Sequence, residues 1–283
     1  MHSAFLLGNG FDLAVGINTS YAEFKKTLLS QQYLDNVPEL LSIIYRETED
    51  KQFSWNDLEK YLEEKLYDKA FTENLEKYKE IKFCEIENRL TNFLQRQEDR
   101  ITSFSKDIIK ENFFNKILLQ CNIMQKLNDE VQIYTLNYTD YLDQYFSVYH
   151  LHGSIHNGGN IILGTSLASY CKRKELPAFL CKEELIKTLG KPYTEYLNNL
   201  LNADTIIIFG CSLGDSDDYI WLRIREWLKV KTHHLYIYDY KESLNNIIFQ
   251  KFGSSNIQVF DTESVEFNGI EIKESGMFDG LIR

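Results

Sequence analysis

The hydrophobic positions of the chain follow two patterns, one typical of buried strands and one typical of helices. Residues 4–7 and 204–209 are short, largely apolar runs without alternation, as expected for strands buried on both faces of a parallel sheet. Further strands are expected at residues 131–136, 148–151, 161–163, 234–239 and 257–260, with a hairpin at 266–271. The strand pattern therefore covers both ends of the chain.

Helical spacing dominates the stretch between these two strand regions. Four apolar positions there recur at steps of three and four: Phe83, Ile86, Leu90 and Phe93. A further helix is expected over residues 106–127. The sequence predicts an α/β fold in which residues 1–30 and 128–283 form a Rossmann-like parallel sheet with helices on both faces. Residues 31–127 are expected to form a helical insertion subdomain.

A glycine loop follows the first strand directly. Gly8 and Gly10 allow a sharp turn and close approach of a ligand to the main chain, and a helix that begins near Phe11 would direct its N–H groups at the same place. These features favour a phosphate site. Leu13 replaces the third glycine of the dinucleotide-binding fingerprint, so a simple tight turn between strand and helix stays an alternative. Asp12 suits a ribose hydroxyl or a helix cap better than a phosphate.

Composition narrows the classes of function. The 283 residues carry a net charge of −11, which argues against broad binding of nucleic acid or anionic membranes. No apolar run reaches the roughly 18 residues of a membrane-spanning helix, and the N-terminus has no basic region typical of a signal peptide. The five cysteines contain no C-x-x-C pair, so a zinc ribbon is not indicated. We expect a cytoplasmic protein with reduced thiols.

Polar side chains follow four of the expected strands. The four strand ends are Gly8–Asp12, Asn137–Asp140, His152–Ser154 and Gly210–Asp215. Because ligands of open parallel sheets bind beyond the carboxyl ends of the strands, these segments predict one shared cleft. His152 and Asn137 are its candidate reactive groups, although a buried structural histidine and a turn asparagine are the ordinary alternatives.

Two specific motifs resemble a known family. The run Leu7-Gly-Asn-Gly-Phe-Asp-Leu-Ala14 with Thr19-Ser-Tyr21, and the run Phe209-Gly-Cys-Ser-Leu-Gly-Asp-Ser-Asp217, resemble the bacteriophage abortive infection AbiH family. The wider motif series is similar to that of the sirtuin-like NAD-binding fold. Its parts are Gly8-x-Gly10, Gly16-Ile17, Thr135-x-Asn137, Leu151-His152-Gly153-Ser154 and Gly210-x-Ser212-Leu213. The resemblance implies a phage-defence protein with a sirtuin-like core that binds NAD.

The same resemblance implies a role for each matching position. The implied cofactor-binding residues are Gly8, Asn9, Gly10, Asp12, Gly16, Ile17, Thr139, Gly153, Gly210, Ser212, Leu213 and Asp215. The implied catalytic residues are His152, Asn137 and Asp140, and no metal ligand is implied. Thr139 stands where the sirtuin-like pattern commonly has aspartate, with Asp140 one position further on. The zinc cysteines of sirtuins are missing, which favours simple NAD cleavage over protein deacylation.

The implied reaction is loss of nicotinamide from NAD through a transition state with positive charge on the ribose carbon. His152 would accept a proton from a ribose hydroxyl or water that Asn137 positions. The expected partners are NAD or a related nucleotide and a phage-derived trigger, without direct contact to nucleic acid or membrane. Self-association stays open.

Two other classes of function stay open. The first is a metal-dependent hydrolase, since His150 and His152 leave the same face of a strand, with His156 nearby and Asp12 and Asp140 as further ligands. The second is a nucleotide-binding sensor without catalysis, which Thr139 in place of aspartate would suit.

Overall fold

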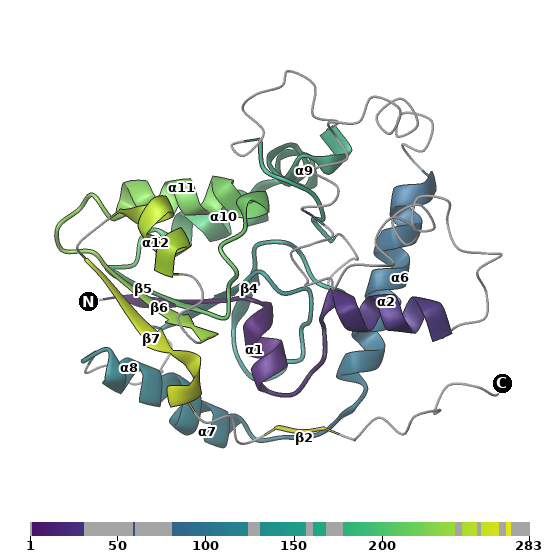
Figure 1. Cartoon of the computed structure of the whole chain (residues 1–283), viewed down its shortest axis with the longest axis horizontal. Coiled ribbons are helices and arrows are strands. Elements are labelled where there is room, and N and C mark those ends of the chain that lie inside the picture. The colour runs from purple at the N-terminus through teal and green to yellow at the C-terminus, as the bar shows by residue number, and fades with distance from the viewer. Residues whose placement is uncertain are drawn as a thin grey trace.

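The centre of the molecule is a parallel sheet with helices on both faces (Figure 1). The computed structural model describes residues 2–30, 59, 81–123, 131–156, 161–167, 178–240, 245–253, 256–265 and 270–272. The six strands of the sheet are β1 (Ser3–Leu7), β3 (Gln132–Thr135), β4 (Val148–His150), β5 (Thr205–Phe209), β6 (His234–Asp239) and β7 (Ile257–Asp261). They lie in the order β4-β3-β1-β5-β6-β7, and all neighbours run parallel.

This order places a topological switch point beside β1. The chain builds the sheet outward from β1 through β3 to β4, and then returns to add β5, β6 and β7 on the other side. The carboxyl ends of β1 and β5 therefore lie next to each other, with Leu7 opposite Phe209. Ligands of open α/β sheets bind in the crevice at such a point. The architecture is that of a Rossmann-like fold.

Six of the seven expected strand regions contain a strand. The exception is residues 161–163, which the sequence analysis expected as a strand and which form none. These residues are buried, and Ile162 donates its N–H to the carbonyl oxygen of His152 at 2.8 Å. A short apolar run predicts that a segment is buried but does not predict its backbone conformation. Residues 161–163 are buried as an irregular segment that does not pair with the sheet.

One face of the sheet is covered by three helices, which lie above it in Figure 1. They are α10 (Lys191–Leu200), α11 (Asp218–Trp227) and α12 (Asn245–Phe252). Ala4 and Leu6 of β1 pack in this layer, together with Ile206 and Ile208 of β5 and the indole of Trp221. Successive strand side chains alternate between the two faces, which is why the apolar runs are uninterrupted.

The opposite face is covered by residues 106–120, which lie below the sheet in Figure 1. The sequence predicts one helix here, and the structure divides it into α7 (Lys106–Ile109), a π-helical turn (Lys110–Asn115) and α8 (Lys116–Gln120). The wide π turn carries Phe113 and Phe114, whose rings each lie 5.0 Å from a ring of the sheet, Phe209 and Phe5 respectively. Helix α8 ends at Gln120, before the expected limit, and Asn122 beyond it adopts a positive φ of 56° that does not continue a helix.

The other elements among the described residues lie toward the carboxyl edge of the sheet (Figure 1). They are α1 (Asn9–Ala14), α2 (Tyr21–Ser30), α6 (Ile81–Glu98), α9 (Lys182–Leu189) and three 3₁₀ turns (Ala178–Leu180, Asp215–Asp217, Thr262–Ser264). Two further strands, β2 (Ile101–Phe104) and β8 (Ile270–Ile272), pair antiparallel. The sequence did not predict β2. The turn of the expected hairpin, residues 266–269, lies outside the described residues, and Ile270–Ile272 pairs with β2.

Much of the expected helical insertion, residues 31–58 and 60–80, also lies outside the described residues. Within the described part, α6 packs against α2, with the rings of Phe24 and Phe93 5.3 Å apart. Residues 106–120 were expected in the insertion, yet they form one layer of the α/β core. The division into two units stays a prediction.

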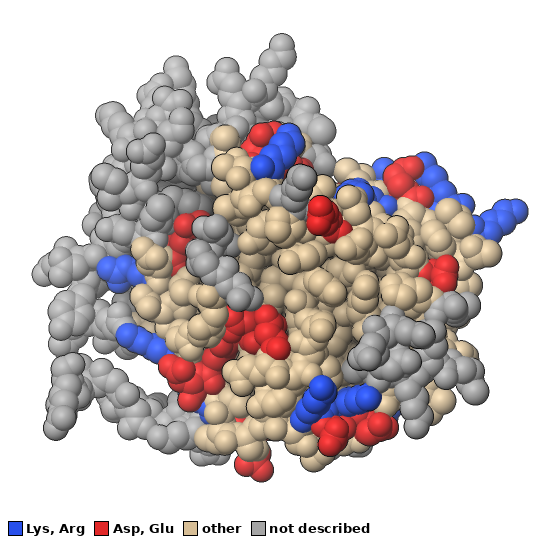
Figure 2. Space-filling view, turned by 180° about the vertical axis from the view of Figure 1, so that it is seen from behind, with Lys and Arg blue, Asp and Glu red and all other residues tan. Residues whose placement is uncertain are grey.

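Charged side chains are unevenly distributed over the described surface of this acidic protein (Figure 2). In the view from behind, acidic side chains gather near the middle of the face, while basic side chains lie in small groups around it (Figure 2). Among the described residues, no helix combines the length and apolar character that are needed to cross a membrane.

Candidate functional site

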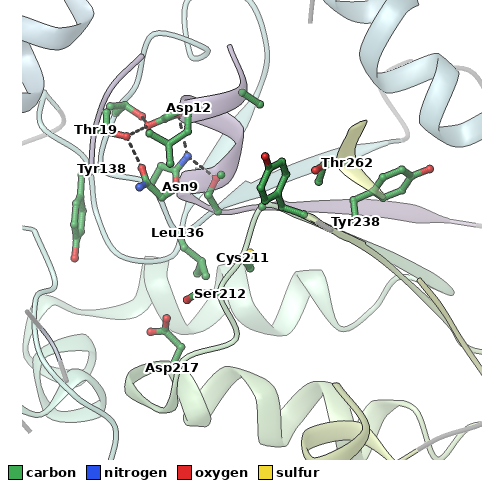
Figure 3. A pocket seen from close by; sticks show the side chains of 18 of the residues that line it. Asn9, Asp12, Thr19, Leu136, Tyr138, Cys211, Ser212, Asp217, Tyr238 and Thr262 are labelled. Carbon is green, nitrogen blue, oxygen red and sulfur yellow. Dashed lines mark hydrogen bonds between the residues drawn. The ribbon is translucent and has the colours of Figure 1, made fainter. Parts of the chain in front are cut away.

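A cavity of about 700 Å³ opens at the switch point, where the carboxyl ends of β1, β3, β4, β5 and β6 meet. Figure 3 shows its lining: Asp12, Asn9 and Thr19 lie on one side, Ser212 and Asp217 on another, and Tyr238 and Thr262 on a third. Nine of the expected site residues line it: Gly8, Asn9, Gly10, Asp12, Asn137, Thr139, His152, Gly210 and Ser212. The cavity thus joins all four strand ends that the sequence analysis singled out.

The glycine loops after β1 and β5 pack backbone against backbone. A Cβ atom on Gly8 would lie 2.6 Å from the carbonyl oxygen of Gly210, and one on Gly210, whose φ is +67°, would lie 2.6 Å from the amide nitrogen of Phe11. Gly10 donates its N–H to the Gly210 carbonyl oxygen at 2.8 Å. The glycines were expected to admit a phosphate. In the structure the missing side chains instead allow the two glycine loops to pack against each other. The N–H of Gly10 donates within that contact and is not available to a ligand.

Asp12 is the most deeply buried carboxylate of the cavity wall, with 1% of its surface exposed. Its two oxygens accept hydrogen bonds from Thr139 (2.8 Å), Asn137 (3.0 Å), Tyr141 (3.1 Å) and Thr19 (3.4 Å). All of these donors are neutral. Burial raises the pKa of Asp12 to about 6, and the four hydrogen bonds only limit the rise. The group can therefore hold or release a proton near neutral pH.

Asn137 is held in one orientation by both of its amide hydrogens. Its Nδ2 donates to Asp12 Oδ1 at 3.0 Å and to the carbonyl oxygen of Gly8 at 3.1 Å. The assignment of the amide is unambiguous, because both of these partners are acceptors. Within the described chain no donor reaches Oδ1, and Asn137 lines the cavity. The arrangement presents a fixed acceptor for a water or a hydroxyl group.

His152 belongs to a buried chain of charges. Its Nε2 lies 3.3 Å from Asp217 Oδ1 and 3.0 Å from the Tyr219 hydroxyl oxygen. The same Asp217 oxygen accepts from Lys182 Nζ at 2.6 Å, and Lys182 also pairs with Glu59 at 2.9 Å. Burial alone would raise the pKa of Asp217, but the Lys182 ammonium and the His152 ring outweigh it and hold that pKa below its usual value.

The ionised Asp217 fixes the tautomer of His152. A carboxylate can only accept, so Nε2 of the ring carries the hydrogen and Nδ1 is the basic nitrogen. Burial alone would lower the pKa of Lys182, but Asp217 and Glu59 raise it, which keeps the ammonium charged. The cluster holds an oriented imidazole beside the cavity.

The far side of the cavity is lined by the carboxyl end of β6 and by residues that follow β6 and β7. Its residues include Tyr238, Asp239, Tyr240, Thr262 and Glu263. Aromatic rings beside carboxylates suit a planar base and the hydroxyl groups of a sugar. The sequence analysis did not select these residues, although Asp239 ends an expected strand and could have been found by the same rule as Asn137.

A comparison with known proteins decides the family. Residues 4–239 match the family model described as bacteriophage abortive infection AbiH. The chain is a member of the AbiH family. The family implies a role in phage abortive infection. No curated protein matches the chain.

In this AbiH protein, six expected site residues do not line the cavity: Gly16, Ile17, Asp140, Gly153, Leu213 and Asp215. Leu213 is buried in the core with a φ of 55°, and Ile17 is buried in the other layer. The side chain of Asp215 is 69% exposed and pairs with Lys251 at 2.8 Å. Asp217, two residues further on, takes the place in the cavity wall that was expected for Asp215.

The histidines of the AbiH chain do not gather as the metal-hydrolase alternative expected. The Nδ1 of His150 lies 3.0 Å from the carbonyl oxygen of Asn137, and its Nε2 lies 3.0 Å from Asp143. Burial alone would lower the pKa of His150, but Asp143 outweighs it and raises the pKa. The His150 ring thus contacts the backbone of Asn137, whereas the His152 ring contacts Asp217, so the two imidazoles have different partners.

Sequence reasoning missed Lys182, Glu59, Tyr219 and Asp217. Lys182 follows no expected strand. In the sequence it precedes Glu183 and Glu184, and such a run of charged residues is typical of the exposed first turn of a helix. Only the fold shows that its ammonium is buried.

Proposed function

We propose that this AbiH protein binds NAD or a related nucleotide in the switch-point cavity and cleaves the N-glycosidic bond to nicotinamide. The observation that carries the proposal is that Asn137 and His152, from the ends of the neighbouring strands β3 and β4, line one cavity, each with a fixed orientation. The motif resemblance to the sirtuin-like fold supports it, since these two positions match the asparagine and histidine of that pattern.

The reaction converts NAD and water to nicotinamide, ADP-ribose and a proton. As the bond to nicotinamide breaks, positive charge develops on the ribose, and the carboxylates of Asp12 and Asp217 in the wall stabilise it. Asn137 Oδ1 accepts from the attacking water or from a ribose hydroxyl. The basic Nδ1 of His152 takes up the proton, and Asp217 stabilises the imidazolium that forms.

The charges of the cavity favour recognition through the nucleoside parts of the ligand. Lys182 is the one lysine or arginine among the described lining residues, and it is committed to Asp217 and Glu59. The acidic and aromatic residues after β6 and β7 suit ribose hydroxyls and adenine. We therefore expect binding to depend less on the pyrophosphate than is usual for a glycine-loop site.

The test is release of nicotinamide from NAD by purified protein, measured by chromatography. Asn137→Ala and His152→Ala are each expected to lower turnover about 100-fold or more, because the first removes a positioned hydrogen-bond acceptor and the second a positioned proton acceptor. Asn199→Ala, on the exposed side of α10, and His234→Ala, at the amino end of β6, are matched controls and should keep wild-type turnover.

Calorimetric titration with NAD, run beside the turnover assay, separates the alternatives. Binding without turnover, also in extract from phage-infected cells that would supply a trigger, would favour the sensor function. Absence of both binding and turnover would contradict the cofactor assignment. Adenosine, which lacks the phosphates, should compete with NAD for binding if the nucleoside parts dominate recognition.

A further inference from the structure

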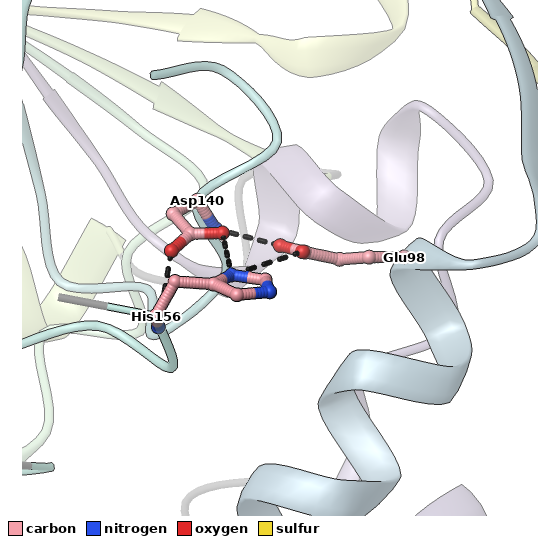
Figure 4. A group of neighbouring side chains, drawn as sticks. All are labelled: Glu98, Asp140 and His156. Atoms are coloured by element: carbon pink, nitrogen blue, oxygen red, sulfur yellow. Dashed lines mark hydrogen bonds and ion pairs between the residues drawn. The ribbon is translucent and has the colours of Figure 1, made fainter. Parts of the chain in front are cut away.

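A second group of ionisable side chains lies outside the cavity. Glu98 ends α6, Asp140 lies in the loop after β3, and His156 lies in the loop after β4. One ligand atom from each lies within 4.8 Å of the other two, and Figure 4 shows the three side chains converging. We propose that Glu98, Asp140 and His156 bind one divalent transition-metal ion of the Zn²⁺ or Mn²⁺ type.

The separations are close to those of a metal site. His156 Nδ1 lies 3.9 Å from Glu98 Oε2 and 2.5 Å from Asp140 Oδ1. Nitrogen and oxygen ligands lie about 2.0–2.2 Å from Zn²⁺, so two ligands of one ion are at most about 4 Å apart. The glutamate and histidine already satisfy this limit. The contact between histidine and aspartate needs to open by a fraction of an ångström.

The backbone orients one oxygen of each carboxylate and leaves the other toward the centre of the group. Glu98 Oε1 accepts from the N–H groups of Asp140 (2.6 Å) and Tyr141 (3.2 Å). Asp140 Oδ2 accepts from the N–H of His156 at 3.2 Å. Such outer contacts are what hold metal ligands in position. Glu98 Oε2 accepts no hydrogen bond from the described residues, although only 9% of Glu98 is exposed.

The charges also point to a cation. Two buried carboxylates lie side by side, and within the described chain they share one ion-pair partner, the His156 ring, while neither pairs with a lysine or an arginine. Buried charges are normally paired or bound to metals. The His156 side chain is 51% exposed, which provides an entry path and leaves coordination positions for water. One imidazole and two carboxylates suit Zn²⁺ or Mn²⁺, whereas Mg²⁺ and Ca²⁺ prefer oxygen ligands alone.

The experiment is titration of untagged, chelator-treated full-length protein with Zn²⁺ and separately with Mn²⁺ by calorimetry. One equivalent is expected to bind. Loss of a ligand in His156→Ala should weaken binding at least as much as the 10- to 100-fold that loss of an outer-shell partner costs. His156 is exposed enough for this variant to fold, which circular dichroism checks. Glu98→Gln should weaken binding as well, since it keeps the backbone contacts and removes the charge.

The matched controls are His234→Ala and Glu195→Gln, two residues outside the cluster, and both should bind the metal as wild type does. The proposal is overturned if the wild-type protein binds neither ion, or if His156→Ala binds as tightly as wild type. Because the readout is metal binding, the result does not depend on NAD turnover.

Discussion

The cavity wall contains two buried aspartates whose surroundings differ. Asp12 is held by four neutral donors, and burial raises its pKa to about 6. Asp217 is also buried, but it lies against Lys182 at 2.6 Å and His152 at 3.3 Å, and its pKa is held below the usual value. At Asp12 the neutral hydrogen bonds do not compensate for the loss of water around the charge, whereas at Asp217 the buried ammonium and the His152 ring do.

The difference separates two chemical roles. Groups whose pKa values are pushed apart in one site commonly divide proton transfer from electrostatic stabilisation. Asp12 can exchange a proton near neutral pH. Asp217 keeps its charge and orients His152. Three predictions test this contrast, and the first removes the cation on which it depends.

Replacing Lys182 with methionine should have the largest effect. Lys182→Met removes the buried ammonium that pairs with the carboxylates of Asp217 and Glu59. Breaking a buried ion pair on one side costs about 3–5 kcal/mol of unfolding free energy. Urea denaturation at neutral pH measures it. The control is Lys187→Met, which removes an exposed lysine 2.5 Å from Glu184 and should change stability by less than about 1 kcal/mol. Equal losses in both variants would contradict the role of Lys182.

The second prediction uses the opposite signs of the two pKa shifts. The pKa of Asp12 rises from 3.8 to about 6 on folding, so its contribution to stability is complete below pH 4 and is lost as the pH rises through 6. The loss amounts to about 3 kcal/mol for a shift of about two pKa units. Asp217 has a lowered pKa, so its contribution is present above pH 4 and is lost as the pH falls below its usual range.

Denaturation between pH 3 and pH 8 measures both contributions. In Asp12→Asn the decline between pH 4 and 6 should be smaller than in wild type, and at pH 7 the variant should lose little stability. In Asp217→Asn the loss should be large at pH 7. Parallel curves for wild type and Asp12→Asn would show that Asp12 titrates as an ordinary surface carboxylate.

The site shows what the sequence could predict. Asp12, Asn137 and His152 were found because the carboxyl ends of parallel strands meet at one edge, so a local pattern carries long-range information. The same rule could not distinguish Asp217 from Asp215, because both lie in one acidic run. The 3₁₀ turn over these residues determines which of the two carboxylates lies against Lys182. The long-range packing of the two glycine loops was equally hidden.

The fold shows the same division. Six strand regions could be predicted because buried parallel strands have a strong local signature. The partner of β8, the π turn over Phe113 and the irregular segment at 161–163 could not, because tertiary packing decides them.

Thr139 provides the finest test of the contrast and has the smallest expected effect. Its hydroxyl donates to Asp12 Oδ2 at 2.8 Å, the shortest of the four hydrogen bonds of that carboxylate. Aspartate at this position, as in the sirtuin-like pattern, would place a second carboxylate against Asp12, so a hydroxyl donor is the compatible choice. Thr139→Val removes the donor and keeps the shape.

The variant should lose about 1–2 kcal/mol of unfolding free energy at pH 8, where Asp12 is charged, and less at pH 4, where it is protonated. A further rise in the pKa of Asp12, by about one unit, should accompany the loss. Carbon NMR titration of labelled aspartate carboxyl groups measures that pKa directly. Thr139→Ser keeps the donor and should titrate as wild type does. If Thr139→Val leaves the pKa unchanged, neutral donors do not set the properties of Asp12, and its difference from Asp217 arises from the charged partners of Asp217 alone.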